Sequence, residues 1–140
     1  MRLRIVTPLE VVVDQDDVAS LRAEDPSGAF GVLPRHAAFL TSLAISIVSW
    51  SVDKSRRHYC AVRGGVLTVE AGREITIATR EAVVSDNLGA LDKDVLQRFR
   101  SERETERTTY IESSRLQLNA IRQIIRYLRP DRMRDERGRL

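Results

Sequence analysis

Residues 28–41 read GAFGVLPRHAAFLT, and this stretch decides the fold more than any other part of the chain. Its two glycines permit backbone angles that are closed to other residues, and Pro34 fixes a bend. Neither a simple strand nor a simple helix requires this mixture. We therefore expect a shaped loop with apolar anchors, namely Phe30, Val32, Leu33, Phe39 and Leu40.

Three other segments share a pattern with this loop. They are IVTP at residues 5–8, VRGGVLTV at 62–69 and ITIAT at 75–79. In order and spacing, the four segments resemble the epsilon subunit of F-type ATP synthases. The resemblance covers residues 1–84, whereas the remainder is similar only in character, as a charged helical tail.

The chain also departs from that family at several positions of the loop. Arg35 stands where the family usually has Gly, Ala38 where it has Pro, and Ala29 where an acidic residue is common. These differences indicate a variant lineage, and the alternate, sodium-type bacterial ATPases are the candidate.

The first part of the sequence consists of short stretches in which apolar residues recur at about every second position. Asp, Gly, Pro and Ser interrupt these stretches from Leu3 to about Val84. Many short strands at close spacing favour a sandwich or a flattened barrel. We predict a β + α protein in which a β-sandwich of about ten short strands fills residues 1–88.

A helical tail is predicted after this domain. No Gly or Pro lies between residues 90 and 129, and apolar residues recur there every three or four positions. The segment 100–109 is wholly polar, so we expect the turn of a C-terminal α-helical hairpin there, with a single long helix as the open alternative. Residues 130–140 are charged and almost without apolar side chains, and are predicted to be disordered.

The charge is distributed unevenly along the 140 residues. Up to Leu88 there are ten basic and eleven acidic residues, and after it 13 basic and nine acidic, so the net charge of +3 comes from the tail. Such a tail is compatible with an acidic protein partner, with nucleic acid, or with a solvated helix.

Cys60 is the only cysteine, which excludes an intramolecular disulfide and a cysteine-based zinc cluster.

The residues offer no recognisable catalytic set. His36 lies in the loop and His58 in a predicted hairpin, and neither has a nucleophile placed beside it by motif. Residues 91–96, LDKDVL, keep only the first two positions of the ATP-binding motif found in some epsilon subunits and lack its Arg-Ala pair. We therefore expect no enzyme activity, no metal and no cofactor.

The resemblance implies a non-catalytic subunit of the central stalk of a proton- or sodium-translocating ATP synthase. Its partners would be the gamma subunit, the rotor-ring subunits and the catalytic alpha and beta subunits. No stretch approaches the ~18 apolar residues that span a bilayer, so membrane association would be through the complex, at the cytoplasmic face of the bacterial inner membrane. The resemblance implies an interface with gamma and the rotor ring at Phe30, Val32, Leu33, His36 and Phe39. The alternative for the apolar residues of this set is that they close one end of the sandwich.

A stripe of arginines gives the tail a candidate regulatory site. Arg115, Arg122 and Arg126 are separated by seven and four residues, which places them on one side of a helix. They either form a solvated edge or bind an acidic surface of the catalytic subunits and inhibit ATP hydrolysis.

The alternative function is a stand-alone β-sandwich adaptor whose basic tail binds nucleic acid or an acidic protein. The aromatic residues of the tail, Phe99, Tyr110 and Tyr127, are spaced for helix packing, which disfavours nucleic acid.

Overall fold

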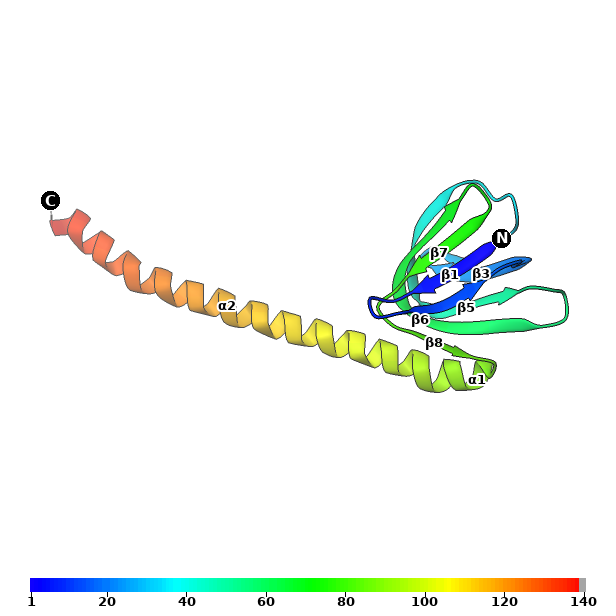
Figure 1. The fold of residues 1–140 in the computed structure, drawn as a ribbon. Coiled ribbons are helices and arrows are strands. Elements are labelled where there is room, and N and C mark those ends of the chain that lie inside the picture. Colours follow the sequence, from blue (N-terminus) through cyan, green and yellow to red (C-terminus); the bar gives the residue numbers. More distant parts are fainter. Residues whose placement is uncertain (139–140) are drawn as a thin grey trace. The chain divides into compact units, whose positions relative to one another are not determined.

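A computed structural model describes residues 1–138 as eight β-strands followed by helix (Figure 1). The strands are β1 (Arg2–Val6), β2 (Val11–Gln15), β3 (Ser20–Asp25), β4 (Gly28–Val32), β5 (Phe39–Ser51), β6 (Arg57–Glu70), β7 (Glu74–Ala78) and β8 (Ala82–Ser85). The helical elements are α1 (Leu88–Ala90), the π-helical turn η1 (Leu91–Leu96) and α2 (Gln97–Gly138). The first compact unit is Met1–Arg100, and the second begins at Ser101.

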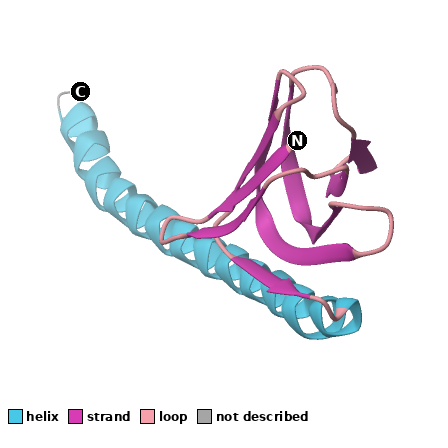
Figure 2. Cartoon of the chain, turned by 45° about the vertical axis from the view of Figure 1, so that its right-hand side comes forward, coloured by secondary structure: helices cyan, strands magenta, loops and turns pink. Residues whose placement is uncertain are grey.

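The strands form one continuous sheet in the order β2-β1-β7-β6-β5-β3-β4, with β8 paired to β6. Only β1 and β7 pair in parallel; the other pairs are antiparallel. β5 and β6 are long, with 13 and 14 residues, and each takes part in both layers of the sandwich. The second half of β6 pairs with β7, whereas its first half pairs with β8. Figure 2 shows the strands curling around a common interior.

The sheet bends where Gly64 and Gly65 lie in β6. Their φ angles are +67° and +112°, in the region that favours glycine. A Cβ atom on Gly65 would lie 2.1 Å from the carbonyl oxygen of Ala78 on the neighbouring strand. The sequence VRGGVLTV therefore contains a bend between the two layers.

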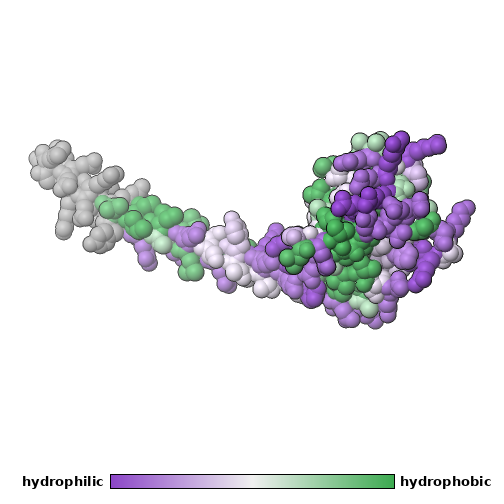
Figure 3. Space-filling model, viewed as in Figure 1, coloured by the Kyte–Doolittle hydropathy of each residue, from purple (hydrophilic) through white to green (hydrophobic). Residues whose placement is uncertain are grey.

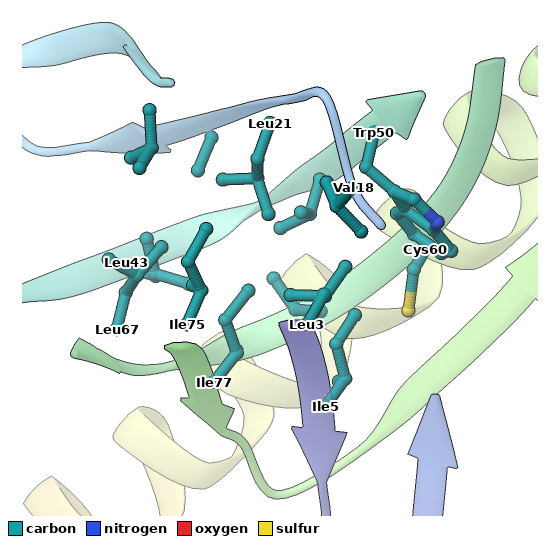
Figure 4. Close-up of a cluster of buried hydrophobic side chains, with 14 of the residues drawn as sticks. Leu3, Ile5, Val18, Leu21, Leu43, Trp50, Cys60, Leu67, Ile75 and Ile77 are labelled. Carbon is teal, nitrogen blue, oxygen red and sulfur yellow. The ribbon is translucent and has the colours of Figure 1, made fainter. Parts of the chain in front are cut away.

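The interior of the sandwich is filled by side chains from most of the strands (Figure 4). Alternate residues of one strand face inward, so β1 contributes Leu3 and Ile5 and β7 contributes Ile75 and Ile77, all fully buried. Burial of one such side chain stabilises the fold by about 1.5–3 kcal/mol. The opposite wall of the interior includes Leu21 and Trp50.

The sandwich is confirmed, but its strands are fewer and two of them longer than expected. The eight strands replace the predicted set of about ten short ones because β5 continues as one strand through Ser42, Ser46 and Ser49, although its buried positions shift by one residue between Leu43 and Ser46. Serine in an apolar stretch predicts an interruption of the strand, yet Ser46 is buried and its hydroxyl donates to the carbonyl of Ala44 at 2.9 Å.

A helical root, defined here as α1, η1 and the start of α2 as far as Phe99, completes the first unit. Asn87 caps it, because its side-chain oxygen accepts a hydrogen bond from the amide of Ala90 at 3.2 Å. The π-helical bonding of η1 joins residues five apart, so Leu91 and Leu96 lie on the same side, and both are buried. The compact unit consequently extends to Arg100 rather than ending at Leu88.

The predicted helical hairpin is wrong, and the alternative of one long helix is what the structure contains. α2 runs without interruption from Gln97 to Gly138. The polar segment 100–109 stays helical because it holds no Gly or Pro, and the hydroxyl of Thr105 donates to the carbonyl of Ser101 at 3.0 Å. In place of the disordered segment expected for residues 130–140, α2 continues to Gly138; residues 139–140 lie outside the described residues.

Candidate partner-binding surfaces

A tight turn closes the connection between β4 and β5. The amide of His36 donates to the carbonyl of Leu33 at 3.1 Å, with Pro34 and Arg35 as the two central residues. Arg35 has φ +69°. Proline followed by a residue with positive φ is the pattern of a type II turn, in which glycine is usual at the second central position. Arg35 therefore occupies a position whose geometry suits glycine.

Aromatic contacts brace this turn against β4. The ring of Phe39 meets the ring of Phe30 edge to face at 5.7 Å and the imidazole of His36 at 5.8 Å. We define the turn surface as Leu33, Arg35, His36, Phe39 and Leu40. Leu33 is 62% exposed and Leu40 69% exposed, so the turn surface presents apolar area to solvent on a braced loop.

The five residues assigned to a partner interface by sequence divide between the surface and the interior. Leu33, His36 and Phe39 lie on the turn surface. Val32, in contrast, is fully buried in the core and Phe30 packs against that core, so neither presents an exposed anchor in this chain. The strand period explains the difference, because Phe30 and Val32 are two apart in β4 and point to the same, inward side.

A second free surface lies on the outer side of the layer that contains β1, β2 and β7. One row of residues crosses five strands there, and each residue of the row pairs with the next one on the neighbouring strand. The side chains of the row are small and mostly apolar. We call it the open face; in strand order its members are Val11, Val6, Ala78, Val66 and Ser42. Val66 is 41% exposed and Val11 48% exposed. Sequence reasoning missed the open face, although the consecutive apolar pair Val66 and Leu67 signals a strand that is apolar on both sides.

The outer side of the other layer is covered by the helical root. Leu91, Leu96 and Phe99 are buried with Ala61 of β6, and partly buried residues of β5 and β8 pack around them. Glu81 adds a polar tether, because its carboxylate forms an ion pair with Arg98 of the root and lies 4.0 Å from the guanidinium of Arg63 in β6. The molecule thus covers one side of its sandwich and leaves the open face bare.

An apolar stripe runs along the second unit of the chain. Its members are separated by seven, three, four and three residues, which is the heptad spacing of helices that pack against another helix. They are Ile111, Leu118, Ile121, Ile125 and Leu128, all between 44% and 57% exposed. Figure 3 shows the apolar colouring of this part of α2. The candidate regulatory residues Arg115, Arg122 and Arg126 are exposed on the same helix and border this stripe.

In the described part of the chain, the cysteine is buried and both histidines make contacts with neighbouring groups. Burial raises the pKa of the Cys60 thiol to about 12, which removes it as a nucleophile. His36 is engaged by the carbonyl of Ala37 at 2.7 Å, and His58 stacks on Trp50 with ring centroids 5.7 Å apart. Within residues 1–138 no group of three or more metal-ligating side chains gathers, and no helix is long and apolar enough to cross a membrane.

Comparisons with known proteins agree with this arrangement. The family described as "ATP synthase, Delta/Epsilon chain, beta-sandwich domain" matches residues 1–85. The chain is 42% identical over 132 residues to "ATP synthase epsilon chain 2" of Paraburkholderia xenovorans, with 94% of this chain and 95% of the relative covered. It is 38% identical over 128 residues to "ATP synthase epsilon chain 2" of Cereibacter sphaeroides, covering 91% and 88%. The "ATP synthase epsilon chain" of Geotalea uraniireducens is 34% identical over 88 residues, which is 63% of this chain and 62% of the relative.

Two solved assemblies contain chains with a similar fold. One is the Euglena gracilis mitochondrial ATP synthase, in a structure of OSCP, F1 and c-ring, with a TM-score of 0.55 and 26% identity over 59% of this chain and 51% of that chain. The other is the central stalk and c-ring of the Tetrahymena thermophila mitochondrial ATP synthase, with a TM-score of 0.51 and 17% identity over 59% and 65%, which supports the fold alone. On the family match and the near full-length relatives, this chain belongs to the delta/epsilon family of ATP synthase chains.

Proposed function

We propose that this chain is the non-catalytic epsilon subunit of a rotary F-type ATP synthase and that it couples the gamma subunit to the membrane rotor ring. The observation that carries the proposal is the pair of bare apolar surfaces on a rigid sandwich. The turn surface and the open face belong to the same compact unit, and the side opposite the open face is already covered by the helical root. A coupler needs two such contacts on one stiff body.

The open face is the proposed contact for the gamma subunit. Its row of Val, Ala and Ser residues carries small side chains, so another sheet or a helix can approach closely and bury Val66 and Val11. The turn surface is the proposed contact for the rotor ring. In this arrangement the chain is peripheral, bound through the complex to the cytoplasmic face of a bacterial inner membrane.

The tail is proposed to regulate ATP hydrolysis. Its heptad stripe fits a partner helix, and Arg115, Arg122 and Arg126 beside the stripe fit acidic side chains on that partner. No carboxylate lies between Ser113 and Pro130, so this part of α2 is purely cationic. These features favour an acidic protein surface, such as that of catalytic alpha or beta subunits, over nucleic acid.

The relatives also favour a variant lineage. The two that are similar along nearly the whole chain both carry the designation "epsilon chain 2", whereas the Geotalea relative matches over 88 residues. We propose that this chain belongs with the former group.

Calorimetric binding to the gamma subunit of the same organism tests the stalk role. The full chain should bind, and so should a chain that ends at Arg100, because the first unit contains both the open face and the helical root. Val66→Lys should weaken binding by about tenfold or more through a buried, unpaired charge. Val84→Lys is the matched control, since Val84 is 46% exposed on β8 and lies outside the open face. Absence of binding by the unmodified chain to a folded gamma subunit would reject the proposal.

ATP hydrolysis by the assembled complex tests the regulatory role. Assembly with the chain that ends at Arg100 should give faster hydrolysis than assembly with the full chain. The triple replacement of Arg115, Arg122 and Arg126 by Ala should lie between the two. Equal hydrolysis rates in all three assemblies would remove the tail from regulation and leave the stalk role intact.

A further inference from the structure

The turn surface carries a cation in a backbone conformation that arginine disfavours. Arg35 has φ +69° at the position of the Leu33–His36 turn where glycine is usual. For a residue with a Cβ atom this left-handed region is costly, so glycine there would relieve strain. A strained backbone at an exposed residue with a long charged side chain supports the hypothesis that the side chain has a use.

The turn is fixed by contacts on both sides, which holds Arg35 in place. The amide of Arg35 approaches the carbonyl of Gly72 at 3.4 Å, and a Cβ atom on Gly72 would lie 2.5 Å from the Cα of Arg35. Pro34 precedes it, and the rings of His36 and Phe39 pack on each other behind it. The backbone of Arg35 therefore cannot relax by moving the loop, and its exposed side chain projects from a rigid corner.

The electrostatic surroundings leave this cation without compensation from its own segment. From Pro26 to Val52 the chain contains no carboxylate, so Arg35 is the one permanent charge along β4, the turn and most of β5. The flanking Asp25 is engaged, because it accepts hydrogen bonds from the amide of Ser27 and from the hydroxyl of Thr41, each at 2.9 Å. Within residues 1–138, Arg35 forms no ion pair.

We infer that Arg35 is a specificity-determining anchor of the turn surface, and that it binds a carboxylate on an acidic loop of the rotor-ring subunit. The inference rests on the proposed stalk function and names the chemistry of the partner that the turn surface selects. Exposed Leu33, Phe39 and Leu40 lie within five residues of Arg35 in the sequence, so the matching segment carries an Asp or Glu together with apolar residues. Burial of this apolar area on docking excludes water, which strengthens the pair of charges.

A polypeptide suits the turn surface better than a membrane does. Electrostatic binding to anionic lipid uses clusters of several Lys and Arg residues, whereas this surface offers one. A single guanidinium with a fixed fork of donors suits one carboxylate bound through two hydrogen bonds.

The test measures binding of the full chain to a purified assembly of the gamma subunit and rotor ring from the same organism, together with the thermal midpoint of the free chain. Arg35→Gly should leave the midpoint unchanged or raise it, and should weaken binding by about tenfold or more with a shallower dependence on salt. Arg35→Lys should recover part of the affinity, because lysine restores the positive charge but not the two parallel hydrogen bonds that a guanidinium donates to a carboxylate. Lys54→Ala, which removes an exposed cation from the β5–β6 hairpin, should change neither quantity.

The outcomes separate this inference from the proposed function. Equal affinity of Arg35→Gly and the unmodified chain overturns the role of Arg35 and leaves the stalk role standing. Absence of binding by the unmodified chain overturns both. Binding to vesicles of phosphatidylcholine and phosphatidylglycerol tests the lipid alternative. If Arg35→Gly abolishes binding to these vesicles while binding to the protein assembly is unaffected, the ligand of Arg35 is a lipid headgroup. The inference is then wrong.

Discussion

Gly65 and Ala78 approach so closely that a Cβ atom on the glycine would lie 2.1 Å from the carbonyl oxygen of Ala78. Both residues belong to strands whose pairing is fixed on either side of this point, since Val66 pairs with Ala78 and Leu43 pairs with Gly65. The contact is backbone against backbone, so no side chain can rotate away to make room. The bend between the two layers therefore depends on Gly65.

Gly65→Ala should lower the free energy of unfolding by about 2–4 kcal/mol, because it combines a steric clash with a φ of +112°. Urea denaturation followed by tryptophan fluorescence of Trp50 measures the change. Gly31→Ala serves as the control, since its Cβ would meet only the carbonyl of Leu21 at 3.7 Å, and should cost less than about 1 kcal/mol. A Gly65→Ala chain as stable as the control would show that the bend tolerates a side chain.

Phe99→Ala should destabilise the first unit by about 3–5 kcal/mol, because Phe99 is fully buried between the helical root and the sheet. Leu118→Ala removes an exposed side chain from the same helix and should change stability by less than about 0.5 kcal/mol. Chemical denaturation of both variants provides the comparison. Similar losses for the two would contradict the assignment of Phe99 to the core.

A chain that ends at Leu88 should be less stable, and more prone to aggregate, than a chain that ends at Arg100. The shorter chain loses Leu91, Leu96 and Phe99 and so exposes the apolar side chains of β5, β6 and β8 beneath them. Thermal melting and light scattering of the two chains would reveal the difference. If they melt at the same temperature and remain monomeric, the helical root contributes nothing to the sandwich.

Cys60 should resist thiol reagents in the folded chain at pH 8. Burial raises its pKa to about 12, so the reactive thiolate is scarce and the sulfur is also inaccessible. Addition of urea should make labelling fast and complete, with a midpoint equal to that of unfolding. Prompt labelling without denaturant would contradict the buried position.

Asp25 should contribute to stability in a pH-dependent way. Hydrogen bonds from the Ser27 hydroxyl, then from Thr41 and the amides of Ser27 and Gly28, hold the pKa of its carboxyl below the usual value. Because the folded pKa is the lower one, the stabilisation is complete above the unfolded pKa of about 3.9 and is lost as pH falls through the folded pKa. Urea denaturation across this acidic range should show a shallower decline for Asp25→Asn than for the unmodified chain. Parallel declines would mean that these hydrogen bonds do not favour the ionised form.

Much of the first unit could be predicted from sequence because its information is local. The period of two in β1 and β7 identifies the buried residues, and the glycine pair of β6 marks the bend. The length of β5 could not be predicted in this way, since Ser46 is polar in sequence but buried with its hydroxyl bonded to the chain. Tertiary packing overrode the local signal.

The candidate surfaces were predictable only in part. Val32 and Leu33 are adjacent and equally apolar, yet one is fully buried and the other is 62% exposed, a difference that depends on which side of β4 faces the core. The open face arises from pairing among five strands, and the only sign of it within one strand is the consecutive apolar pair Val66 and Leu67 of β6. In the tail, the polar segment 100–109 suggested a turn, but helix needs only the absence of Gly and Pro and adequate propensity, and α2 continues through it.

The continuity of β5 and β6 through both layers has a mechanical consequence. Twelve residue pairs join these two strands from Phe39 to Ser51, so a force on one layer reaches the other along unbroken backbone rather than through a flexible connection. A pull along the strands loads this row of pairs in shear, so the bonds share the load instead of opening one after another. In a rotating shaft, such a domain would turn as one body and lose little motion to internal twisting.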